Sequence, residues 1–126
     1  MRTMLPALLL ASAASGAFAA AEQDKAMLAL AAKSGCLSCH HVDPGAKGPD
    51  GLPPVGPPWR DVAQQYRGHT DALETLTRTV MKGSNPYESH WKGKASGLAM
   101  PPNAVAIQEA DARELVRWIL SLDAKP

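Results

Sequence analysis

The feature that most constrains this chain is the pentapeptide Cys36-Leu37-Ser38-Cys39-His40, which has the form C-x-x-C-H. Residues three apart on a helical turn share a face, so both cysteine side chains can reach one edge of the same flat cofactor. The histidine follows directly and can turn its imidazole under that cofactor. This is the spacing of a c-type haem attachment site, in which two thioethers hold the porphyrin and the imidazole binds the iron. We therefore predict one covalent haem c at Cys36 and Cys39, with His40 as an axial ligand.

A thiol redox pair and a zinc site are the two alternatives to haem attachment at the same cysteines. A thioredoxin-like redox pair normally lies beside a βαβ pattern, and the flanking sequence has none. A zinc site needs about four ligands, and the chain has no cysteines beyond Cys36 and Cys39. The motif therefore favours haem over a thiol module or a non-haem metal site.

The first residues have the features of an export signal. Arg2 precedes the apolar run 4–11, and Ala17-Phe18-Ala19 gives the small-x-small pattern of a cleavage site. We predict a secretory signal peptide over residues 1–19, with cleavage near 19–21, and a single periplasmic domain over residues 22–126. The alternative is an uncleaved membrane anchor, but the strongly apolar part is short for a bilayer span. Without a second long apolar run, no membrane anchor is expected after cleavage.

Charge and size limit the partners. The chain has 13 basic and 12 acidic residues, and loss of Arg2 with the signal peptide leaves equal numbers. A nucleic-acid-binding role would need a basic stripe, so it is not expected. A chain this short builds a modest core, and the haem should be its largest single piece. We expect a monomer that meets redox partner proteins of unknown identity.

Apolar periodicity predicts an all-α domain of four to five helices around the haem. The expected helices are residues 22–34, 59–66, 71–82 and 108–122. Gly35 and Gly83 are placed to end the helices before them, and Asp71 with Glu74 has the spacing of a capping box. Segments 41–58 and 84–105 are rich in Gly and Pro and are expected to be surface loops.

Met100 is the predicted second iron ligand. It stands in a loop directly before Pro101 and Pro102, whose restricted backbones can hold one thioether rigidly. Met27 and Met81 fall on expected helices, where methionine usually fills the core. The remaining candidates were His41, His69 and His90. If neither Met100 nor any of these residues binds, the sixth position of the iron is open, and a catalytic haem is the alternative.

With both ligands placed, the chain resembles the class I cytochromes c, and more narrowly the short bacterial type that carries electrons in the periplasm. The resemblance covers most of residues 22–126, in the family's order. The matching pieces are residues 35–40, 55–57, 61–63, 82–84, 91, 100–105 and 118–121. It implies a small all-α globule whose first and last helices cross.

The resemblance also implies roles for individual residues. His40 and Met100 would be the axial ligands, and the Pro57 carbonyl would accept a hydrogen bond from His40. Trp91 would donate to a haem propionate, and Asn103 would steady the Met100 sulfur. The loops after His41 and Trp91 are longer than in the shortest family members.

The implied function is one-electron transfer, with iron cycling between Fe(II) and Fe(III). The chain would pass electrons from a respiratory donor protein to an acceptor protein, and it is not expected to be an enzyme. Two alternatives stay open from the sequence. The chain could be the haem subunit of a periplasmic dehydrogenase, or a catalytic haem protein with an open sixth site.

Overall fold

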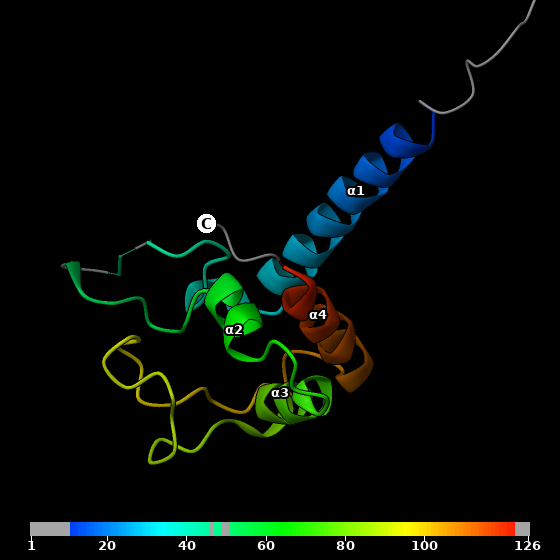
Figure 1. Ribbon diagram of the computed structural model, residues 1–126. Helices are drawn as coiled ribbons and strands as arrows, with labels where there is room; N and C mark the ends of the chain where they lie inside the picture. Colours follow the sequence, from blue (N-terminus) through cyan, green and yellow to red (C-terminus); the bar gives the residue numbers. More distant parts are fainter. Residues whose placement is uncertain (1–10, 46, 49–50, 123–126) are drawn as a thin grey trace, which may run out of the picture.

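The computed structural model describes residues 11–45, 47–48 and 51–122, and this part of the chain is helical (Figure 1). Its elements are α1 (Ala11–Lys33), the 3₁₀ turn η1 (Cys36–Ser38), α2 (Trp59–Gln65), α3 (Ala72–Lys82) and α4 (Glu109–Ser121). Within the described residues, the only β-type pairing outside the helices is an isolated bridge between Lys92 and Ala95. The all-α prediction is confirmed.

Three of the four expected helices agree closely with the observed ones, whereas α1 begins at Ala11, well before the expected start at residue 22. The added turns are rich in alanine, the residue with the highest helix propensity, so the helix continues through them. These outer turns project away from the rest of the molecule (Figure 1). Residues 1–10, which carry most of the apolar run of the expected signal peptide, lie outside the described residues.

The expected capping box at the start of α3 is wrong. Asp71 precedes the helix, but its side chain makes no cap hydrogen bond. Glu74 instead forms an ion pair with Arg113 of α4, with 2.8 Å between Oε2 and Nη1. The hydrogen bond from Arg113 lowers the pKa of Glu74 below its ordinary value. The Glu74 carboxylate therefore binds Arg113 on α4, whereas in a capping box it would accept a hydrogen bond from the backbone at the start of its own helix.

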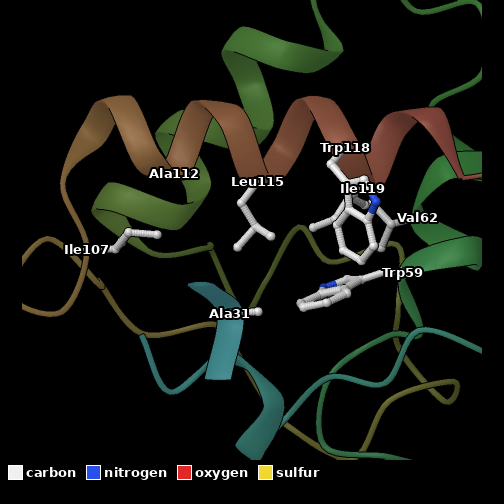
Figure 2. Packing of buried hydrophobic residues seen from close by; sticks show 8 residues of the cluster. All are labelled: Ala31, Trp59, Val62, Ile107, Ala112, Leu115, Trp118 and Ile119. Carbon is white, nitrogen blue, oxygen red and sulfur yellow. The ribbon is translucent and has the colours of Figure 1, made fainter. Parts of the chain in front are cut away.

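The core forms where α4 packs against the other helices. Trp118 anchors it, because its indole N–H donates to Asp24 Oδ1 of α1 at 2.7 Å and its ring meets Trp59 of α2 edge-on at 5.7 Å. The first and last helices are therefore fixed to each other. The buried apolar cluster consists of Ala31, Trp59, Val62, Ile107, Ala112, Leu115, Trp118 and Ile119 (Figure 2).

Candidate functional site

The C-x-x-C-H motif lies on one tight turn directly after α1. Gly35 adopts φ 77°, a left-handed conformation that suits glycine, and turns the chain from α1 into η1. The amides of Cys39 and His40 both donate to the Cys36 carbonyl, at 3.2 and 3.0 Å. The two cysteines are half-buried and form no disulfide, so both sulfurs are available for attachment, and burial raises the pKa of the Cys36 thiol. The local geometry thus keeps both cysteines and the histidine within a single turn.

The His40 imidazole has a fixed orientation. Its Nδ1 lies 2.8 Å from the Pro57 carbonyl oxygen. Since a carbonyl can only accept, Nδ1 carries the proton and the neutral ring keeps its lone pair on Nε2. Burial lowers the pKa of His40 below its ordinary value, against the raising effect of the Pro57 hydrogen bond. A neutral imidazole with a defined tautomer is the form that binds a metal.

Two neighbours confine the His40 ring. Trp59 stacks on it with 5.8 Å between ring centroids and 23° between planes. Gly56 is buried against it, and a Cβ atom on this glycine would lie 2.6 Å from His40 Cε1. The Gly56 amide also donates to the Cys39 carbonyl at 2.8 Å. No separate role was predicted for Gly56 from the sequence. The one feature that could have indicated this contact is its position directly before Pro57.

We expect Gly56→Ala to disturb the His40 ring. Overpacking of this kind typically costs about 1–3 kcal/mol of unfolding free energy, and tilting the ring would lengthen the bond to Pro57. Thermal melts and optical spectra of the haem-loaded protein would measure both effects. Gly93→Ala is the control for the spectrum, because a Cβ atom there meets nothing within 4 Å; at its φ of 76° alanine costs stability through the backbone, without contact with His40. It should leave the haem spectrum unchanged, whereas a wild-type spectrum for Gly56→Ala would contradict the prediction.

A cavity of about 420 Å³ opens beside this ring, between α2, α3, α4 and the loops 39–58 and 84–101. Its volume lies in the range of about 300–1,000 Å³ that is usual for small-molecule and cofactor sites. His40 and Met100, which lie far apart in the sequence, both line it. The apolar part of the lining includes Val55, Val62, Leu76, Val80, Val116 and Ile119.

The backbone of Met100 is held by two hydrogen bonds to Ser84, which follows α3. Its amide donates to the Ser84 hydroxyl at 2.8 Å, and its carbonyl accepts from the Ser84 amide at 2.9 Å. Met27 and Met81 pack against the apolar core instead. Of the described residues that line the cavity, Met100 is the only methionine.

Trp91 and Asn103 occupy different positions relative to the cavity. Trp91 is half-buried and lines it. Asn103 is not among the described lining residues; its side-chain amide donates to the carbonyls of Pro101 at 2.6 Å and Val80 at 3.3 Å. As placed here, Asn103 secures the backbone next to Met100. The predicted contacts of Trp91 with a propionate and of Asn103 with the Met100 sulfur stay predictions.

One polar pair in the cavity wall was not predicted from the sequence. Tyr66 and His90 both line the cavity, and the Tyr66 hydroxyl lies 3.2 Å from His90 Nε2. Tyr66 comes from the end of α2 and His90 from the loop after α3, so no sequence pattern connects them.

The donor set fits haem c. Two free thiols and an imidazole share one turn, and a thioether lines the cavity that the imidazole enters. The buried side-chain nitrogen and oxygen atoms of the described residues all have hydrogen-bond partners. The cavity that His40 and Met100 line therefore suits a mostly apolar group attached at η1.

Comparison with known proteins agrees with this reading. A profile of the Cytochrome c family matches residues 28–123, and the chain belongs to that family. It is 40% identical over 95 residues to cytochrome c-551 of Allochromatium vinosum, covering 75% of this chain and 84% of the relative. It is 37% identical over 93 residues to cytochrome c-552 of Hydrogenobacter thermophilus, covering 74% and 78%. The crystal structure of Nitrosomonas europaea cytochrome c552 matches with a TM-score of 0.58 and 33% identity, covering 76% of this chain and 99% of that one.

The class I cytochrome c prediction is thereby confirmed, together with its cofactor and its function. The protein carries one covalently attached haem c and acts as a one-electron carrier, which requires redox partner proteins. Among the described residues, no helix combines the length and the apolar character needed to cross a membrane.

Proposed function

We propose that Cys36 and Cys39 form the two thioether bonds to the haem, and that His40 and Met100 are the axial ligands of its iron. The observation that carries this proposal is that His40 and Met100 line one cavity although they lie 60 positions apart in the sequence. The hydrogen bond from His40 Nδ1 to the Pro57 carbonyl supports it, because it leaves Nε2 free for the metal. Trp91 is proposed to donate to a propionate.

This ligand set favours electron transfer over catalysis. The haem, when bound, supplies the Fe(II)/Fe(III) couple, and a His/Met pair raises its reduction potential. With His40 and Met100 both bound to the iron, no position on the metal would be left for a substrate. The role of the chain is then to hold the two ligands still, which the Ser84–Met100 and His40–Pro57 hydrogen bonds favour.

Export to the periplasm is the proposed route to the working protein. The stretch Ala17-Phe18-Ala19 lies on the outer turns of α1, with Phe18 72% exposed, so a peptidase could reach it. Asp24, which binds Trp118, lies after the proposed cleavage region and would be kept. We propose a monomer that exchanges electrons with separate donor and acceptor proteins, rather than a fixed subunit of a dehydrogenase.

A redox titration followed by optical spectroscopy tests the function. We expect one reversible one-electron step, a low-spin ferric spectrum and no rapid binding of carbon monoxide to the ferrous protein. A high-spin ferric spectrum with rapid carbon monoxide binding would instead favour the catalytic alternative. Gel filtration of the periplasmic fraction would separate the free carrier from the dehydrogenase subunit, because only the latter elutes with a larger chain.

A further inference from the structure

Two loops that are far apart in the sequence are joined to each other at the cavity. The Ser96 amide donates to the Pro54 carbonyl and the Gly97 amide to the Val55 carbonyl, both at 2.9 Å. In Figure 1 these are the green and the yellow loops that lie beside each other, away from α4. We call this pair of hydrogen bonds, made by Pro54, Val55, Ser96 and Gly97, the loop clasp.

The loop clasp depends on a close backbone approach. A Cβ atom at Gly97 would lie 2.6 Å from the Val55 carbonyl oxygen, which is too close for any other residue without movement of the chain. Gly97 is not in a left-handed conformation, so the glycine is needed here for space rather than for its φ angle.

The loop clasp connects the two segments that carry the proposed ligands. On one side, Val55 is followed by Gly56, against His40, and by Pro57, which binds the His40 ring. On the other side, Gly97 stands three positions before Met100. Ser84 ties Met100 to the end of α3. Among the described residues, the backbone hydrogen bonds of segment 84–100 that reach the His40 side of the cavity are those of the loop clasp.

Side-chain burial adds little support to this part of the chain. Ser96, Gly97, Leu98 and Ala99 are all exposed, and Leu98 is 85% exposed. Segments with few buried apolar contacts open easily, with low local free energies. Apart from the contacts that Gly97, Leu98 and Ala99 would make with the haem as residues lining the cavity, the position of residues 96–99 therefore rests on the loop clasp.

We propose that the loop clasp is a positioning element that keeps the Met100 sulfur on the iron, with Ser96 and Gly97 as its key residues. The inference rests on the proposed assignment of Met100 as a ligand. Opening the clasp would free residues 96–99, and Met100 would then be held by Ser84 and, through the Pro101 carbonyl, by Asn103. The ferric haem would spend more time with its sixth position open to a competing ligand.

Imidazole binding to the haem-loaded ferric protein tests the proposal. Ser96→Pro removes the N–H that donates to the Pro54 carbonyl. Gly97→Ala adds a Cβ atom that pushes the two loops apart. Each should raise imidazole affinity about tenfold, as expected for the loss of one or two backbone hydrogen bonds. Ser96→Ala is the matched control, because it keeps the amide and changes only an exposed side chain. In the wild-type holoprotein, the Ser96 and Gly97 amides should exchange with solvent more slowly than that of Lys92.

The Met100→Ala background separates this proposal from the ligand assignment. If the loop clasp acts through Met100, adding Ser96→Pro to Met100→Ala should change imidazole affinity by less than about twofold. If Met100→Ala alone leaves imidazole binding unchanged, the ligand assignment fails. If Met100→Ala opens the site but Ser96→Pro and Gly97→Ala keep wild-type affinity, the loop clasp proposal fails. A lower melting temperature without a change in affinity would also overturn it, because that result indicates a purely structural role.

Discussion

Replacing Met100 by alanine should remove the weak far-red band of sulfur-to-iron charge transfer from the ferric protein and open the sixth position to added ligands. The reason is that Met100 is the only methionine among the described residues that line the cavity, and its backbone is fixed by Ser84. Met100→His should keep the position filled but lower the reduction potential substantially, since axial ligands span about 0.8 V across haem proteins. Optical spectra and redox titrations of the purified holoproteins would measure these changes.

Met81→Leu is the control for this prediction. Met81 packs against the apolar core, and a volume-conserving swap of this kind usually costs less than about 1.5 kcal/mol of unfolding free energy. The far-red band should therefore survive it. If the band disappears with Met81→Leu and persists in Met100→Ala, the ligand assignment is wrong. If wild-type protein already binds cyanide readily, the sixth site is open and the carrier function loses to a catalytic one.

The double variant Cys36→Ala with Cys39→Ala should lose covalent haem and most of its stability. Leaving a cavity of about 420 Å³ unfilled would cost up to about 10 kcal/mol at roughly 24 cal/mol per Å³. Part of that cavity opens to solvent, so the figure is an upper bound, yet it is comparable with the whole unfolding free energy of a domain, about 5–15 kcal/mol. We expect apoprotein mass in the denatured state and a broad, low-temperature melt by circular dichroism.

Leu37→Ala is the matched control for the cysteine variant. Leu37 lies on the same turn and is 38% exposed. The variant leaves both cysteines unchanged, so the haem should stay attached after denaturation. A cooperative melt of the double cysteine variant at the wild-type temperature would contradict the claim that the haem is part of the core. Wild-type protein that releases its haem on denaturation would contradict thioether attachment itself.

Short-range chemistry explains what could be predicted from the sequence. The C-x-x-C-H spacing depends only on one turn of backbone, and the structure keeps Cys36, Cys39 and His40 on that turn. The helices α2, α3 and α4 follow from apolar periodicity, which reports a local burial pattern. Met100 could be singled out because two following prolines restrict its backbone whatever the rest of the chain does. The contact between His40 and Pro57 could be expected only through the family resemblance.

Tertiary contacts decided the rest, because each depends on a partner that sequence distance hides. Glu74 pairs with Arg113 on another helix instead of capping its own. Asn103 donates to the Val80 and Pro101 carbonyls, a placement that only the packing of its loop on α3 could specify. From the sequence, Gly56 and Gly97 look like ordinary loop glycines. In the structure, a Cβ atom would clash with the His40 ring at Gly56 and with the Val55 carbonyl at Gly97. The sequence alone determined the cofactor and predicted its attachment turn. The tertiary structure determined how the two loops that carry the proposed ligands are held together, since backbone hydrogen bonds between loops leave no periodic trace in the side chains.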